Sequence, residues 1–290
     1  MGTAATADEA LRARHSPSSA TLVKALLYGL LIGGAIIALL PTLWMISASF
    51  MATGEANSYP PHFFPHAPTL SHYRTLFDRL SLGRYLANSA FVAVTVTVLS
   101  LVVNSLAGYA LAKLRFKGRE RLFRTLALGL VIPVQVSMLP LFLLMKSLHL
   151  VNTYWGVIIP GMASIFGIFL IRQYALAIPE DLLDAARVDG ASELRIYRSV
   201  VLPVVAPILA TLAIWTFLAT WNDFMWPLII LSDERRFTLP VALASLSGEH
   251  VQDTELMMAG SVVTVLPVLL AFLIIQRYYV AGIMVGSVKE

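Results

Sequence analysis

Six stretches of this chain run for at least 21 residues without a single Asp, Glu, Lys or Arg, and this feature constrains the fold most. The windows are 25–54, 85–112, 125–145, 147–171, 199–222 and 256–276. At 1.5 Å per residue, a helix of 21 residues reaches about 31 Å, which matches a hydrocarbon core about 30 Å thick. Because a helix satisfies its own backbone in lipid, the windows predict an all-α polytopic membrane bundle with six transmembrane helices.

The alternative, a large soluble all-α protein, fits the composition poorly. Hydrophobic residues make up 58% of the chain and charged residues 13%, about half the charged share of a soluble domain. Helices of soluble proteins also tend to be shorter and to carry a polar face. The first window is too long for the apolar stretch of a signal peptide. With no cysteine, the chain has neither disulfides nor thiolate metal sites.

The distribution of positive charge between the windows predicts the orientation. Of the 21 lysines and arginines, 15 fall on the side that carries both termini and six fall on the other side. Because Lys and Arg are retained in the cytoplasm, we expect both termini to be cytoplasmic in a multi-pass protein of the inner (cytoplasmic) membrane. The net charge of +4 forms no basic stripe, so no nucleic-acid partner is expected.

These observations divide the chain into five segments. Residues 1–20 are predicted to be a disordered cytoplasmic tail and 21–54 the first transmembrane helix. Residues 55–84 form an extracytoplasmic loop, and 85–278 form the remaining transmembrane domain. A cytoplasmic tail is expected over 279–290.

The loop between the fourth and fifth windows, residues 178–203, is far richer in charge than its neighbours. Pro179 and the acids after it are typical of a helix start, and Asp189-Gly190 is typical of a stop, which predicts a short helix over 180–188. Ser192 can cap a second helix that leads into the fifth window. Physical reasoning leaves two roles open for the short helix: docking to another protein, or lying amphipathically among lipid headgroups.

The same loop is similar to the EAA loop of binding-protein-dependent ABC importers, whose signature is Glu-Ala-Ala, a glycine four positions on, and a later Ile-x-Leu-Pro. The matching residues are Asp184, Ala185, Ala186, Gly190, Val200, Leu202 and Pro203. Asp replaces Glu and Val replaces Ile. The resemblance implies that the short helix is a coupling helix seated in a cleft of an ATPase subunit.

Further motifs resemble the maltose-type, carbohydrate branch of that family. They are Ala107-Gly108-Tyr109-Ala110, Arg115-Phe116 with Gly118-Arg119, Trp221-Asn222-Asp223-Phe224, Trp226-Pro227-Leu228 and Gln276-Arg277-Tyr278. The resemblance implies a permease subunit for an oligosaccharide or sugar derivative. It also implies a second homologous permease, ATP-binding cassette ATPase subunits, an extracytoplasmic solute-binding protein and surrounding membrane lipid as partners.

The chain lacks the residues that other functional classes require. None of the five lysines follows a glycine, so the phosphate-binding loop of an ATPase is absent and ATP hydrolysis falls to a separate subunit. A secondary carrier or channel is the alternative, but the windows hold no ionisable residue apart from His149 near one end. No cluster of His, Asp or Glu within a window suggests catalysis. No catalytic residue, cofactor or metal is therefore expected.

The end of the fifth window supplies the candidates for a translocation path. Trp221, Asn222 and Asp223 combine an aromatic face with an amide and a carboxylate, which are the groups that contact sugars. Two alternatives stay open. Trp at a membrane end often anchors the interface, and these residues could instead seat the binding protein.

Overall fold

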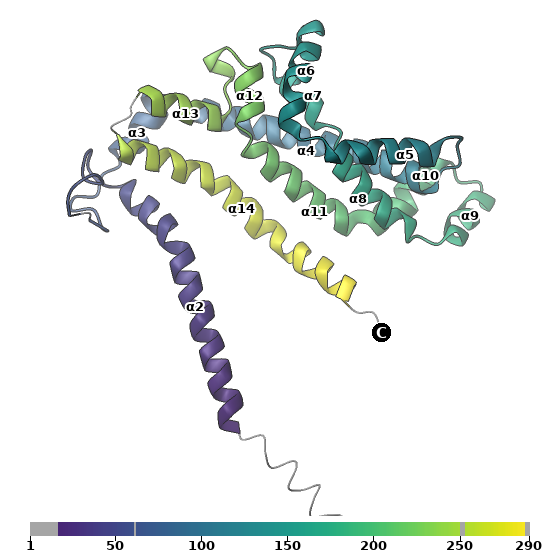
Figure 1. Ribbon diagram of the computed structural model, residues 1–290, viewed down its shortest axis with the longest axis horizontal. Helices are drawn as coiled ribbons and strands as arrows, with labels where there is room; N and C mark the ends of the chain where they lie inside the picture. Colours follow the sequence, from purple (N-terminus) through teal and green to yellow (C-terminus); the bar gives the residue numbers. More distant parts are fainter. Residues whose placement is uncertain (1–16, 61, 250–252, 288–290) are drawn as a thin grey trace, which may run out of the picture.

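The computed structural model describes residues 17–60, 62–249 and 253–287, and every regular element in these ranges is a helix (Figure 1). The elements are α2 (Pro17–Ala48), α3 (Ser71–Arg74), η1 (Thr75–Arg79), α4 (Leu82–Lys113), α5 (Arg119–Leu128), η2 (Gly129–Val131), α6 (Val134–Ser147), α7 (Tyr154–Gly161), α8 (Ile165–Leu176), α9 (Glu180–Val188), α10 (Glu193–Ile196), η3 (Tyr197–Val201), α11 (Leu202–Trp221), α12 (Met225–Ile230), η4 (Glu234–Arg236), α13 (Leu239–Glu249) and α14 (Thr254–Ser287). The all-α fold predicted from the sequence is confirmed.

Within the described ranges, five helical segments are long and apolar enough to cross a membrane. They are Thr21–Ala48, Leu82–Lys113, Tyr154–Leu176, Glu193–Trp221 and Thr254–Leu273. The sixth predicted span, over residues 125–145, is not one straight helix. It is a pair, Arg119–Val131 and Val134–Ser147, bent by 110°. Counting this pair as one span gives six.

The bend in that pair has a local cause. Pro133 has no backbone N–H and disfavours helical geometry in the residue before it, and Ile132 is extended (φ −80°, ψ 119°). The charge-free window over residues 125–145 predicts one span that continues through this proline. The chain instead stops and restarts at Val134.

Helix α4 lies at the centre of the bundle and packs along both α8 and α11 (Figure 1). Its buried face carries small and polar residues, including Ser100, Asn104 and Gly108. At Gly108 the approach to α8 is so close that a Cβ atom there would lie 2.7 Å from the Cβ atom of Ile171. Small side chains therefore set the α4–α8 contact, as is usual for membrane helices.

A break between α7 and α8 is satisfied by a side chain from α4. The chain leaves helical geometry after Gly161 and restarts at Ile165. The fully buried Asn104 accepts a hydrogen bond from the Ser164 backbone N–H at 3.0 Å, and the Ser164 hydroxyl accepts one from the Gly167 N–H at 3.2 Å. Backbone groups freed by the break thus keep partners where water is scarce.

Helix α2 stands apart from the bundle and touches α14 (Figure 1). None of its most apolar window is buried within the chain. A helix that is apolar all round must be covered by lipid or by another protein. Residues 1–16 of the predicted N-terminal tail lie outside the described residues, and α14 is helical through the segment 279–287.

Candidate functional site

Helix α9 occupies 180–188, the bounds that the sequence predicts. Glu180 and Asp181 lie in its first turn, where carboxylates interact favourably with the positive end of the helix dipole. Its other end is a Schellman motif. The Gly190 N–H bonds the Arg187 carbonyl and the Ala191 N–H bonds the Ala186 carbonyl, each at 3.0 Å. The next helix, α10, is capped by Ser192 as predicted.

Gly190 makes this turn possible. Its φ is +78°, in the left-handed region that residues with a Cβ atom rarely adopt, while the space around it is open. The glycine is therefore required by backbone conformation and not by crowding.

The two faces of α9 have opposite environments. Leu183 is fully buried in a cluster with Tyr109 of α4 and Ile171 of α8, and Ala186 packs against the same cluster. On the other side, Ala185 is exposed, and Leu182 and Val188 are 47% and 88% exposed. The helix is anchored to the bundle on one side and presents an apolar face on the other.

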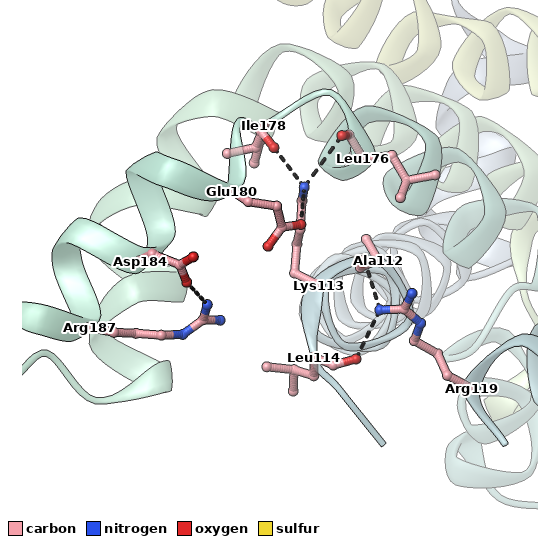
Figure 2. Close-up of polar contacts among 9 residues, drawn as sticks. All are labelled: Ala112, Lys113, Leu114, Arg119, Leu176, Ile178, Glu180, Asp184 and Arg187. Carbon is pink, nitrogen blue, oxygen red and sulfur yellow. Dashed lines mark hydrogen bonds and ion pairs between the residues drawn. The ribbon is translucent and has the colours of Figure 1, made fainter. Parts of the chain in front are cut away.

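A chain of charges ties α9 to α10. Arg187 donates to Asp184 at 2.7 Å, an interaction visible in Figure 2, and to Glu193 at 2.8 Å. Glu193 also accepts a hydrogen bond of 2.6 Å from the Tyr109 hydroxyl of α4. The bonds from Glu193 and Asp184 raise the pKa of Arg187 above its ordinary value. The predicted site residue Asp184 thus orients Arg187, and its side chain remains exposed.

The last two predicted coupling residues, Leu202 and Pro203, begin α11. They follow the π-helical turn η3 (Tyr197–Val201), so α10, η3 and α11 form one continuous span. Leu202 packs against the cluster that holds Leu183, and Pro203 is exposed. The signature residues therefore lie at both ends of one loop that shares a single hydrophobic core.

Lys113, the last residue of α4, lies at the base of α9 (Figure 2). Although it is a lysine, it is only 5% exposed. Its ammonium donates to the Ile178 carbonyl at 2.6 Å, the Glu180 carboxylate at 2.9 Å and the Leu176 carbonyl at 3.4 Å. A buried ammonium requires such compensation, and here it is supplied by the α8–α9 connection.

Two arginines satisfy the carbonyls at the same end of α4. Arg119 donates to Ala112 at 3.3 Å and to Leu114 at 3.1 Å (Figure 2), and Arg172 donates to Leu111 at 3.3 Å. The sequence predicted a role in orientation alone for Arg172 and Lys113, and for Arg119 a further place in a family motif. The sequence did contain one signal that Lys113 has a structural role: it directly follows a window of 28 uncharged residues (85–112), at the end of a predicted span.

The candidate path residues lie in three different environments. Trp221 is 2% exposed, stacks on Phe217 and donates from its indole to the Thr264 carbonyl at 3.2 Å, so it packs inside the bundle. Asn222 is exposed and donates to the Leu218 carbonyl at 2.9 Å. Asp223 is half-buried between α11 and α12.

Asp223 lines a cavity of about 230 Å³ between α4, α6, α7 and the α11–α12 junction. Most of its wall is apolar, and the polar groups come from Asp223, Thr220 and Ser137. Three interruptions of helical geometry border it, at residues 132–133, 162–164 and 222–224. Among the described residues, no three His, Asp or Glu side chains are grouped so as to hold a metal ion.

Comparisons with known proteins place this arrangement in a family. The chain is 42% identical over 258 residues to the arabinooligosaccharides transport system permease protein AraQ of Halalkalibacterium halodurans, covering 88% of this chain and 92% of the relative. It is 31% identical to the diacetylchitobiose uptake system permease protein NgcG of Streptomyces coelicolor, over 96% and 93% of the two chains. It is 33% identical to the lactose transport system permease protein LacG of Rhizobium radiobacter, over 90% and 95%.

A solved structure agrees with these relatives. A chain of a bacterial ABC transporter involved in the import of the acidic polysaccharide alginate superimposes with a TM-score of 0.78 at 28% identity, over 91% of this chain and 99% of that chain. The family model described as binding-protein-dependent transport system inner membrane component matches residues 104–285, well over half of the chain. This protein therefore belongs to the family of inner-membrane components of binding-protein-dependent transport systems.

Proposed function

We propose that this chain is the permease subunit of an ATP-driven importer and that its substrate is a carbohydrate of the oligosaccharide class. Three relatives, which are named for arabinooligosaccharides, diacetylchitobiose and lactose, support this substrate class. The solved neighbour belongs to an importer of the polysaccharide alginate. All of these are saccharides larger than one sugar ring.

The chain works with partners. ATP-binding cassette subunits hydrolyse ATP, a second homologous permease completes the pathway and an extracytoplasmic solute-binding protein delivers the substrate. Helix α2, apolar and unburied by its own chain, requires cover from lipid or from one of these subunits. The bias of Lys and Arg further supports an orientation with both termini in the cytoplasm.

The observation that carries the coupling proposal is the two-sided burial of α9. Leu183 fixes the helix to the bundle, while Leu182, Ala185 and Val188 present an apolar face to the outside. We assign that face to the ATPase subunit. The competing role, an amphipathic helix among headgroups, needs no stop at Gly190 and no ties from Arg187 to Glu193.

Coupling then follows from mechanical connection. Closure of the ATPase subunits on ATP displaces α9, which shares a hydrophobic cluster with α4, α8 and α11. Movement of these helices shifts the population between inward-facing and outward-facing states. The breaks at residues 132–133, 162–164 and 222–224 are points where such movement can concentrate.

The path proposal concerns Asn222 and Asp223, with Trp221 as their support from within the bundle. An exposed amide and a half-buried carboxylate beside a cavity suit the hydroxyl groups of a sugar. Asn222→Ala and Asp223→Asn should lower transport while ATPase stimulation by the binding protein is retained. Loss of both activities would assign these residues to binding-protein docking, and unchanged activities would remove them from the path.

Uptake of labelled oligosaccharides by a deletion strain, with and without a plasmid that restores this chain, tests the function as a whole. Uptake should depend on this chain and on ATP, and should persist when the membrane potential and proton gradient are collapsed. Uptake that follows the gradient and not ATP would favour a secondary carrier and contradict the proposal.

A further inference from the structure

The ammonium of Lys113 connects three helices at one point (Figure 2). Lys113 ends α4. Its carbonyl partner Leu176 ends α8, its carbonyl partner Ile178 lies in the connection to α9, and its carboxylate partner Glu180 is the first residue of α9. Carbonyls at the end of a helix lack partners and carry partial negative charge, so a cation there is favourable. The Lys113 side chain therefore holds the α8–α9 connection against the end of α4.

Lys113 is not needed to finish its own helix. Arg172 binds the Leu111 carbonyl and Arg119 binds the carbonyls of Ala112 and of Leu114, the residue that follows the helix, so other cations already cap this end of α4. All three described partners of the Lys113 ammonium belong instead to the α8–α9 connection. The position of the ammonium thus serves the contact between helices and not the cap of α4.

Helix α4 is tied at its far end as well. The Asn88 amide donates to the Arg235 carbonyl at 3.0 Å and to the Phe237 carbonyl at 2.9 Å, and the Ser89 hydroxyl accepts from the Leu239 N–H at 2.7 Å. These carbonyls and this N–H belong to the segment that leads into α13. The 32 residues of α4 span about 48 Å, so one continuous helix links the base of α9 to that segment.

We infer that α4 is a rigid helix that transmits displacement between the proposed coupling helix α9 and the opposite end of the protein. Lys113 is the positioning residue at one end of α4 and Asn88 at the other. The inference rests on the proposed function, since it takes α9 to be the element that meets the ATPase. A signal at the α13 end, such as arrival of the loaded binding protein, reaches α9 as a displacement of α4. Without the Lys113 ammonium, the α8–α9 connection loses its polar tie to the end of α4, and a displacement of α4 reaches α9 less completely.

The test uses the complete complex in liposomes, with ATPase activity measured in the absence and presence of the substrate-loaded binding protein. In Lys113→Met, basal ATPase activity should persist and stimulation should fall at least about fivefold, the lower range for coupled sites. Lys117→Met is the matched control, because Lys117 is an exposed cation four residues further along, in the loop between α4 and α5. It should keep full stimulation. Full stimulation in an assembled Lys113→Met complex would overturn the inference.

Two further arms separate positioning from a loss of structure. The Glu180 side chain is 48% exposed, so the Glu180→Leu complex should assemble and lose part of the ATPase stimulation. Glu180→Gln keeps a hydrogen-bond acceptor and should therefore keep most of the stimulation. If Lys113→Met fails to assemble, Glu180→Leu decides, and full stimulation in it contradicts the inference.

A double-mutant cycle tests whether α4 transmits the displacement. Asn88→Leu should also lower stimulation, and Asn88→Leu combined with Lys113→Met should be little worse than either alone, because both interrupt one connection. Additive losses would contradict transmission through α4. Ala185→Trp, on the exposed face of α9, tests the underlying proposal separately: if it leaves ATPase binding and stimulation intact, the docking assignment fails whatever Lys113 does.

Discussion

The guanidinium of Arg187 donates a hydrogen bond to the carboxylate of Glu193 at 2.8 Å and so joins α9 to α10 across the Gly190 turn. The side chains are 31% and 46% exposed, so solvent screens the pair. A partly exposed ion pair contributes about 0–1 kcal/mol. The turn is therefore stabilised mainly by its backbone hydrogen bonds and by burial of Leu183. The ion pair adds a smaller, salt-sensitive contribution to its stability.

Removing that ion pair should loosen the loop locally. Arg187→Met is expected to destabilise α9 by less than about 1 kcal/mol, with a larger effect at low salt. Hydrogen exchange of residues 184–190 should accelerate accordingly. Arg195→Met, on the exposed side of α10, is the control. Identical exchange in the Arg187 variant and the wild type at low ionic strength would contradict the assigned role.

Replacing Gly190 should act through backbone strain alone. Valine at φ +78° costs about 1–3 kcal/mol, although nothing lies within 4 Å of an added Cβ atom. Gly190→Val is expected to abolish uptake while the protein remains in the membrane. Gly190→Asn should retain uptake, because Asn tolerates left-handed geometry better. Gly54→Val imposes similar strain at φ +89° far from α9, and equal loss of uptake in both valine variants would remove the special role of Gly190.

Adding one methyl group at Gly108 should disturb the α4–α8 contact. The new Cβ atom would lie 2.7 Å from two side-chain carbons of Ile171 and 3.1 Å from the Arg172 backbone nitrogen. Gly108→Ala is expected to lower stability by about 1–3 kcal/mol, as overpacking usually does. Thermal unfolding of the purified protein measures this. Gly83→Ala, whose Cβ atom would make ordinary contacts at 3.8 Å, should unfold no earlier than the wild type.

The loop that contains Glu55 should lose stability in acid. Bonds from the His66 backbone N–H, the His66 ring and the Ala52 N–H lower the pKa of Glu55 from its usual 4.5 to about 2. Because the pKa of Glu55 is lower in the folded state, its carboxylate stabilises the fold fully when the pH is above the unfolded-state pKa. This contribution to stability is lost as the pH falls from about 4.5 to about 2. The melting-temperature difference between wild type and Glu55→Gln should therefore shrink from pH 5 to pH 3. A difference independent of pH would contradict this, as would the same trend in Glu234→Gln.

The sequence predicts the helical architecture well because lipid imposes it. Long charge-free windows leave the backbone one solution, and five of the six windows correspond to apolar helical spans, of which Tyr154–Leu176 is interrupted at residues 162–164. The extent of the bend at Pro133 was not predictable, because a proline in a membrane helix either kinks it or breaks it according to its surroundings. The break at residues 162–164 depends on Asn104, which lies 60 positions away in the chain.

The bounds of helix α9 were predictable to the residue, because the signals that set them are local. Pro179 with its following acids and the Gly190 stop act within a few positions, and Ser192 caps the next helix. The role of Lys113 was not predictable, because it depends on carbonyls 63 and 65 residues away that only tertiary packing brings together.

The most direct test of the central claim exploits the absence of cysteine from the natural chain. Ala185→Cys, on the exposed face of α9, can be labelled with a thiol-reactive photocrosslinker in the assembled complex. Tyr59→Cys, at a side chain 98% exposed in the loop after α2, is the control. The account predicts that irradiation joins Ala185→Cys, and not Tyr59→Cys, to the ATPase subunit. Crosslinks from Ala185→Cys to lipid alone would contradict the coupling role of α9.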